Sequence, residues 1–481
     1  MAKRLFGAGL GLRTRLLLAL AGATLGALLP VRAQEGLANA PVAVHAVRPR
    51  VLLERLPDKP SQPPALKISI GPLGFSAPGA FYMGQRTSLV SLDFLDEDRL
   101  LFTFRVPGLI RREASEREAG DEEEHRIRAL VLKLPAGAVE AEALWTVHDR
   151  GRYLWMLRDG SFLLRDLRNL EVGDASLELK PYLRFPGPLL WLEMDPTQQF
   201  LVTNSREPIA TEPKPSTATP HPGEEEMPLH SSERQSLGGD SESLGIGTPM
   251  TAEAEKPVEE QKPASQPDLA VRILRRDSGQ VILVSRTRTA VHLPVNSDGY
   301  LESLRARGSG WLLNLNYFSG GSAILGQVDS TCSPLFDFLS QRVILTTACA
   351  NSSAGKLVAM RTDGRRLWEA QTSDTAVWPL VVRAPDGSRF ARETLVVSTP
   401  VSARAPLDLA DIKGQLVEVL DAADGNVALT TTASPTLDAG GNVAISPSGR
   451  RVAVLNGGEI QVFELPLAPP LAEAASHPAA H

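Results

Sequence analysis

The chain has 481 residues, 43% of them hydrophobic, so it is long enough to bury a large core. It carries 50 basic and 56 acidic residues, and five of the basic residues lie within the first 33 positions. The 45 basic and 56 acidic residues beyond position 33 give a net charge of −11. Because nucleic acid binds basic stripes on proteins, we expect no nucleic-acid partner for this acidic chain.

The first 33 residues have the features of a signal peptide. Residues 1–15 contain Lys and Arg but no acid, and residues 16–29, "LLLALAGATLGALL", are apolar. The small residues Val31 and Ala33 follow, at the positions that a signal peptidase reads. The alternative is a retained anchor, although a membrane span needs about 20 apolar residues. We expect cleavage after Ala33, no transmembrane segment afterwards, and a periplasmic or extracellular protein.

Residues 205–268 differ in composition from the rest of the chain. They contain no Phe, Trp or Tyr, and they hold 13 acidic residues against five basic ones. Such a segment cannot bury enough apolar surface to offset its ordering entropy, which predicts a disordered insertion. The sequences on either side look like single strands of one sheet, so we prefer an insertion to a linker between two domains. We also expect a poorly ordered extension over 34–64 and a disordered tail over 467–481.

The remaining residues, 65–204 and 269–466, read as one all-β domain. Short runs rich in Val, Leu, Ile and Phe recur between Gly, Asp, Asn and Pro, for example "RLLFTFRV" at 99–106 and "RVAVLNG" at 451–457. No convincing amphipathic helix longer than two turns interrupts them. This excludes α/β barrels and doubly wound sheets, which place a helix after nearly every strand.

Four segments share one turn pattern. An apolar strand ends in a polar turn, a Gly follows, and an apolar or small residue lies four positions later. The Gly can adopt a positive φ, which a tight hairpin turn requires. The segments are "VLKLPAGAVEA" (131–141), "ILRRDSGQVIL" (273–283), "AMRTDGRRLW" (359–368) and "VLDAADGNVAL" (419–429), with glycines at 137, 279, 364 and 425.

This pattern resembles the repeat A-x-D-x-x-T-G-x-x-x-W of quinoprotein-like β-propellers, with Trp368 as its Trp and Leu429 in that place in the last segment. Residues 442–466, "NVAISPSGRRVAVLNGGEIQVFELP", resemble a WD40-like blade instead. The resemblance covers most of residues 80–466 and implies an uncharacterised secreted bacterial propeller. It also implies that Trp368 packs between blades, and that the tryptophans at 145, 155, 191, 311 and 378 have the same role.

The repeats predict a β-propeller of seven blades, each with four antiparallel strands, with six or eight blades as alternatives. The blades lie near 88–146, 150–183, 188–286, 295–329, 332–371, 375–431 and 440–466. The last blade shows only three strands. We expect its fourth strand from residues 65–87, where "LKISIG" is the candidate, because such closure removes free sheet edges.

The chain has two cysteines, Cys332 and Cys349. In an exported protein they are expected to form a disulfide, and the alternative is a pair of buried thiols. Two cysteines without clustered histidines do not make a zinc site.

Catalytic motifs are missing from the sequence. It contains no G-x-S-x-G, H-E-x-x-H or C-x-x-C-H, so we assign no catalytic, cofactor-binding or metal-binding residue. We expect a non-catalytic binding or scaffold module of the cell envelope. The alternative is a quinone-dependent or hydrolytic enzyme with a site at the propeller mouth, which converging carboxylates, histidines or a metal would indicate.

The segment "TVHDRGRYLWMLRDGSFLLRD" (146–166) is the best candidate for a binding site, because the start of a blade lies at the mouth of the central channel. Arg and Tyr are frequent at binding hot spots. The guanidinium groups suggest a protein or small anionic ligand bearing a carboxylate, bound by a monomer. In the alternative interpretation, Tyr153 packs between blades and His148 forms a surface turn with Asp149. The candidate residues are His148, Arg150, Arg152, Tyr153 and Arg158.

Overall fold

The computed structural model describes residues 50–52, 55–77, 89–106, 124–148, 151–207, 269–306, 310–349, 355–400, 408–437 and 439–470. The chain divides into residues Met1–Ala46 and a second unit, Val47–His481. Only the second unit contains described residues, and the account that follows concerns it alone. The expected signal peptide, the insertion from residue 208 to 268 and the tail beyond 470 lie outside these residues.

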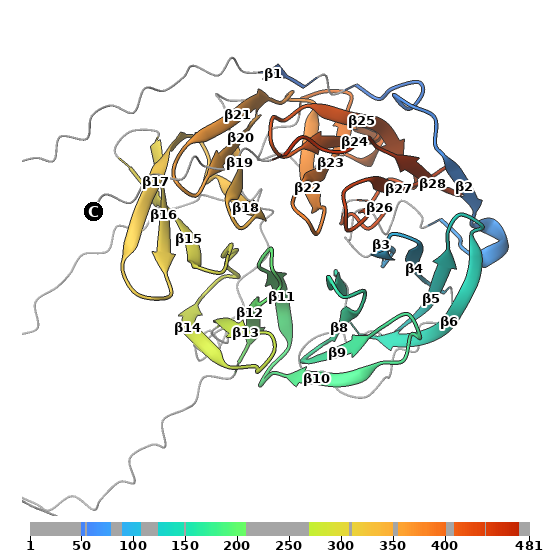
Figure 1. Cartoon of the computed structure of the whole chain (residues 1–481), viewed down its shortest axis with the longest axis horizontal. Coiled ribbons are helices and arrows are strands. Elements are labelled where there is room, and N and C mark those ends of the chain that lie inside the picture. Colours follow the sequence, from blue (N-terminus) through green and yellow to red (C-terminus); the bar gives the residue numbers. More distant parts are fainter. Residues whose placement is uncertain are drawn as a thin grey trace, which may run out of the picture. The chain divides into compact units, whose positions relative to one another are not determined.

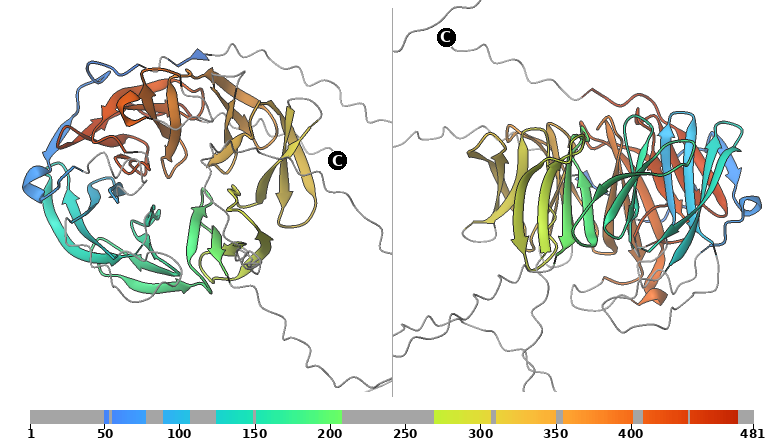
Figure 2. Two further views of the ribbon diagram at one scale, coloured as in Figure 1. Left: turned by 180° about the vertical axis from the view of Figure 1, so that it is seen from behind. Right: turned by 90° about the horizontal axis from the view of Figure 1, so that it is seen from below.

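The described residues form seven sheets arranged in sequence order around a ring, so the chain is a seven-bladed β-propeller (Figure 1). Seen from the side, the strands of successive blades stand next to one another (Figure 2). β26 of the last blade lies against β3 of the first, which closes the ring. The predicted number of seven blades is therefore confirmed.

The first four blades have the following strands. Blade 1 contains β3 (Ser91–Asp96), β4 (Arg99–Arg105), β5 (His125–Lys133) and β6 (Ala138–Val147). Blade 2 contains β7 (Leu154–Met156), β8 (Phe162–Asp166), β9 (Asn169–Gly173) and β10 (Lys180–Arg184). Blade 3 contains β11 (Leu189–Met194), β12 (Phe200–Arg206), β13 (Leu269–Arg275) and β14 (Val281–Thr287). Blade 4 has three strands within the described residues, β15 (Gly299–Arg305), β16 (Gly310–Tyr317) and β17 (Ser322–Asp329).

The last three blades incorporate the N-terminal strands. Blade 5 contains β18 (Leu335–Ser340), β19 (Val343–Cys349), β20 (Gly355–Arg361), β21 (Arg366–Gln371) and the short parallel strand β1 (Arg50–Val51). Blade 6 contains β22 (Ala376–Arg383), β23 (Arg389–Val397), β24 (Ile412–Asp421) and β25 (Val427–Ala433). Blade 7 contains β26 (Val443–Ile445), β27 (Arg451–Asn456), β28 (Glu459–Glu464) and β2 (Leu66–Ser69). Two short 3-10 helices, η1 (Gly71–Leu73) and η2 (Leu409–Asp411), complete the elements.

The ring closes as the sequence predicted. β2, the "LKIS" of the expected closing strand, pairs antiparallel with β28, with Leu66 opposite Val462 and Ser69 opposite Glu459. Residues 50–52 and 55–64, part of the extension expected to be poorly ordered, lie along the outer strands of blades 5 and 6. Leu52 is buried among apolar residues of blade 5, and Ser61 exchanges hydrogen bonds with Thr430 of β25. The described residues between 50 and 69 thus lie along the outer edges of three blades.

The long insertion interrupts a single blade. β12 and β13, which lie on either side of it, pair directly in an unbroken register from Phe200–Arg275 to Arg206–Leu269. β12 continues two residues beyond the predicted boundary at 204, because Ser205 and Arg206 pair with Ala270 and Leu269. The two ends of the insertion therefore lie side by side on one sheet of the same domain.

Apolar side chains fill the spaces between neighbouring blades, and Trp368 shows how. Its indole is 3% exposed, stacks on Phe390 with 6.2 Å between ring centres, and donates a hydrogen bond of 3.0 Å to the carbonyl of Ala422. A Cβ at Gly425 would come within 2.6 Å of this indole. Gly425 has φ +69°, and Gly137, Gly279 and Gly364 also have positive φ, as the turn pattern predicted. Trp368 therefore joins blades 5 and 6, and its predicted packing role is confirmed.

Two further features concern the predictions for export. The structure contains a disulfide between Cys332, just before β18, and Cys349, at the end of β19, with 5.6 Å between the Cα atoms. Among the described residues, no helix is long and apolar enough to cross a membrane.

Candidate functional site: a charged cluster on the inner strands

Charged side chains from several blades meet on the inner strands of the ring. Arg383, at the end of β22, is the link between them. Its guanidinium donates hydrogen bonds of 2.7 Å to the carbonyl of Phe338 in blade 5 and 2.6 Å to that of Met194 in blade 3. One side chain of blade 6 thus spans to two other blades. We call the group the axial cluster: Asp93, Arg152, Glu193, His292, Asp337 and Arg383.

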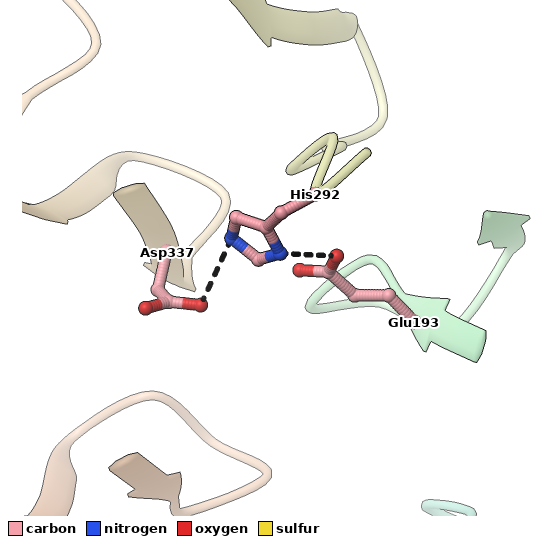
Figure 3. Close-up of side chains that lie close together, drawn as sticks. All are labelled: Glu193, His292 and Asp337. Atoms are coloured by element: carbon pink, nitrogen blue, oxygen red, sulfur yellow. Dashed lines mark ion pairs between the residues drawn. The ribbon is translucent and has the colours of Figure 1, made fainter. Parts of the chain in front are cut away.

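His292 is held firmly between blades 3 and 5. It precedes β15 and follows Val291. The side chain of Asn204 accepts a hydrogen bond from the amide of Val291 and donates one to its carbonyl. The imidazole Nδ1 lies 3.1 Å from a carboxylate oxygen of Glu193, and Nε2 lies 2.6 Å from the carbonyl oxygen of Phe336. Nε2 is also 3.7 Å from Asp337, so the ring lies between two carboxylates (Figure 3).

These contacts decide the charge of the imidazole. Burial alone would lower the pKa of His292, but the nearby carboxylate of Glu193, the charge of Asp337 and the carbonyl of Phe336 raise it to about 9. Both ring nitrogens face acceptors, so each carries a proton in an imidazolium. Burial, with the charge of Glu193, raises the pKa of Asp337, whereas His292 and Arg383 oppose that change.

The same three residues could be considered for a metal ion. Glu193, His292 and Asp337 each offer one ligand atom, and these atoms lie within 4.8 Å of one another. However, a histidine ligand uses the lone pair of a neutral ring, and the two carboxylates lie on opposite sides of this ring (Figure 3). The arrangement fits a histidine cation between two carboxylates, not a shared metal.

Arg152 is the cation of the cluster that remains available to a ligand. Its Nε donates a hydrogen bond of 3.1 Å to the carbonyl of Leu154, and its guanidinium lies 5.4 Å from the ring centre of Trp155. The side chain is exposed, and within the described part of the chain its two terminal nitrogens make no hydrogen bond. Although its surface is open to solvent, the guanidinium is surrounded by protein atoms on the inside of the ring, which lowers the pKa of Arg152; the charges of Asp93, Glu193 and Glu393 oppose this change.

Two acids near Arg152 have raised pKa values. Burial raises the pKa of Asp93 to about 6, although Ser91, which donates a hydrogen bond of 2.6 Å, and Arg152 oppose the change. Burial raises the pKa of Glu393, on β23, to about 8, so this carboxyl is mostly protonated at neutral pH. Gln415 donates a hydrogen bond of 2.9 Å to it. Asp93 and Glu393 are two of the three acids whose charges act on Arg152. Because their pKa values are raised, these two acids carry less negative charge near Arg152 than two ordinary carboxylates would.

The candidate residues from the sequence lie in different places. His148 contacts Asp166, with 3.0 Å between Nδ1 and the carboxylate, and Arg158 donates a hydrogen bond of 2.5 Å to the carbonyl of Pro385 in blade 6. Tyr153 is 2% exposed, and its hydroxyl contacts Thr103 and the carbonyl of Leu89. Arg150 lies outside the described residues. Of the set, the structure brings Arg152 into the axial cluster.

Sequence reasoning missed the other members of the cluster. Glu193 and Asp337 are the single acids in the apolar inner strands "LLWLEM" and "LFDFLS", and this pattern is the only local signal they offer. His292 and Arg383 carry no signal, because their partners are in other blades. The packing role expected for Trp191 is wrong: the side chain is 47% exposed, because β11 is an inner strand with no strand on its axial side.

Comparison with known proteins assigns the chain to no family. No protein-family model matches the chain, and no curated protein matches it. The solved structures to which it is similar include the acylaminoacyl peptidase of Pyrococcus horikoshii, with 10% identity over 76% of this chain and a TM-score of 0.40. This chain covers 49% of that peptidase, so it spans about half the length of that relative.

Two further structures are similar to this chain. One is the uncharacterized protein lmo1340 of Listeria monocytogenes EGD-e, with 9% identity, a TM-score of 0.40, and coverage of 81% of this chain and 97% of that protein. The other is Hsv2p of Kluyveromyces lactis, with 10% identity, a TM-score of 0.33, and coverage of 64% and 71%.

Proposed function

We propose that this propeller is a non-catalytic binding module of the cell envelope, and that its axial cluster binds an anionic, carboxylate-bearing partner. Arg152 is the observation that supports this proposal. Its guanidinium is fixed by Leu154 and Trp155, is exposed, and keeps two terminal nitrogens for a ligand. A guanidinium held in this way can bind a carboxylate through two parallel hydrogen bonds.

The proposal includes an origin for the chain. We propose an exported monomer, periplasmic or extracellular, that belongs to the quinoprotein-like and WD40-like propellers as a secreted bacterial member. The signal-peptide pattern of residues 1–33 and the glycine turns of four blades support this assignment. The disulfide is consistent with an oxidising compartment.

A hydrolytic enzyme is the second candidate, because carboxylates and a histidine do converge on the inner strands. The contacts of His292 favour binding over hydrolysis. A general base needs a free lone pair, whereas both nitrogens of His292 face acceptors on Glu193 and Phe336. Within the described residues, no hydroxyl or thiol lies in hydrogen-bond contact with this ring, as a nucleophile activated by histidine would.

Calorimetric titration of the purified protein with citrate and with hexaglutamate tests the binding function. We expect saturable binding that weakens about tenfold or more in Arg152→Gln, since charged hydrogen bonds are lost. Arg184→Gln, an exposed arginine at the end of the outer strand β10, is the matched control and keeps full affinity. If both anions bind Arg152→Gln as tightly as the wild type, the proposed function is wrong. Steady release of product from a hydrolysable ester would favour the enzyme instead.

A further inference from the structure

The inner strands of blades 3 and 5 stand at matching heights. Arg383 bonds to the carbonyls of Met194 on β11 and Phe338 on β18, which places these two residues at one level. One residue before these on each strand, Glu193 lies at the same level as Asp337. Three residues before them, Trp191 lies at the same level as Leu335. Side chains two residues apart share one side of a strand. Each strand therefore presents an apolar side chain followed by a carboxylate in the same direction.

The apolar level is open to solvent. Trp191 is 47% exposed and Leu335 is 56% exposed, although both belong to inner strands. The indole of Trp191 lies at right angles to the imidazole of His292, with 6.2 Å between ring centres, so these rings meet edge to face. Ligand sites combine apolar and aromatic side chains with a few polar groups, and Trp191 beside His292 and Glu193 has this combination. The cluster thus has two exposed apolar side chains, Trp191 and Leu335, next to two carboxylates, Glu193 and Asp337, which we call its floor.

The carboxylates of the floor need hydrogen-bond donors. Glu193 and Asp337 are partly exposed, and within the described part of the chain His292 is the side chain that forms an ion pair with each of them. An ionised carboxylate can accept about four hydrogen bonds, so both residues keep acceptor capacity for a ligand. Arg152, which interacts electrostatically with Glu193, differs from these carboxylates because it is a hydrogen-bond donor and can bind an anionic group of the ligand.

A ligand that fits must combine three properties: a flat apolar face for Trp191, several hydroxyl donors for Glu193 and Asp337, and one carboxylate for Arg152. An acidic peptide brings carboxylates, which Glu193 and Asp337 would repel, and its acidic side chains carry no donors. A pyranose ring has a C–H face and hydroxyl groups around its edge, and a uronic acid adds one carboxylate. We infer that the axial cluster binds a saccharide that carries carboxylate groups, an inference that rests on the binding function proposed above.

Calorimetric titration with hexagalacturonate, its methyl ester and hexaglutamate tests this inference. We expect the wild type to bind hexagalacturonate at least tenfold more tightly than either of the other two probes. Trp191→Ala should weaken hexagalacturonate binding about tenfold, and Trp191→Phe, which keeps an aromatic face, should restore most of the affinity. Arg152→Gln should abolish the preference for the acid over the ester. Leu144→Ala removes a 58% exposed apolar side chain from the outer strand β6 and should change nothing.

Three outcomes would overturn the inference: no binding of hexagalacturonate at millimolar concentration, equal binding by Trp191→Ala, or equal binding of the methyl ester. Hexaglutamate binding that depends on Arg152, without saccharide binding, would make an acidic peptide the partner. In that case the binding function proposed above stands and only the saccharide is wrong. If none of the anions binds, citrate included, both the proposed binding function and the saccharide inference are wrong.

Discussion

Trp368 and Trp191 lie in similar sequences, "RLWEAQ" and "LLWLEM", and have opposite surroundings. Trp368 is 3% exposed and packs against the next blade, whereas Trp191 is 47% exposed beside the axial cluster. Trp368 belongs to β21, near the outside of blade 5, and Trp191 belongs to β11, the inner strand of blade 3. The position of a strand within its blade therefore decides whether its aromatic side chain stabilises the fold or faces a possible ligand.

The largest expected effect comes from Trp368→Ala. Removing this indole leaves a cavity between blades 5 and 6 and should cost about 3–5 kcal/mol of unfolding free energy. Trp191→Ala should stay within about 0.5 kcal/mol of the wild type, because exposed substitutions rarely cost more. Urea unfolding of both variants measures the difference. Equal losses would show that the two tryptophans have the same structural role and would contradict the comparison.

The disulfide should have the next largest effect on stability. It joins residues with a sequence separation of 17, and closing a loop of this size stabilises a protein by about 3 kcal/mol. The double variant Cys332→Ser with Cys349→Ser should lose about that amount in urea unfolding. The denatured, unreduced wild type should show no free thiol. Two titratable thiols in protein secreted to an oxidising compartment would contradict the disulfide.

Gly425→Ala separates strain from packing at the blade 5–6 contact. A methyl group there clashes with Trp368 and also sits at φ +69°, so we expect a loss of about 2–3 kcal/mol. Gly457 is the matched control: it has φ +59°, and a Cβ there meets nothing within 4 Å. Gly457→Ala should therefore cost only the backbone strain, about 1 kcal/mol. If Gly425→Ala and Gly457→Ala lose equal unfolding free energy in thermal or urea unfolding, the contact with Trp368 contributes nothing to the effect at Gly425.

A further expected effect is on the pH dependence of stability. Because the folded state raises the pKa of Glu393 from 4.5 to about 8, it binds a proton more tightly than the unfolded chain. This contribution is fully present below about pH 4.5 and is lost as the pH rises through 8. Glu393→Gln, which resembles the protonated acid, should remove that decline between pH 5 and pH 8.

Melting temperatures of wild type and Glu393→Gln at pH 5, 6.5 and 8 measure this effect. His292 adds a similar trend at higher pH: its pKa rises from 6.5 to about 9, so its contribution is present below pH 6.5 and lost as the pH passes 9. The decline that remains in Glu393→Gln above pH 7 belongs to this imidazolium. Identical profiles for the two proteins would show that Glu393 does not titrate differently in the folded state.

The fold was largely predictable because its signals are local. The blades repeat the same alternation, four of them share one glycine turn, and β2 was predictable because the last blade lacked one strand. The axial cluster was not predictable, because its members lie in six parts of the chain and meet only when the ring is formed. Arg152 was found as one arginine in a basic segment, and nothing in its neighbourhood indicated Glu193 or His292.

The pairing of β2 with β28 has a consequence for how the ring assembles. These two strands lie near opposite ends of the chain, so their contact requires closing almost the largest loop that this domain allows. Topologies dominated by such distant pairings fold slowly, since loop entropy is lost before the contacts form. During synthesis β2 must wait, unpaired, until the last blade has emerged. Shortening the chain by even one strand at its C-terminal end would leave an open ring with two exposed sheet edges.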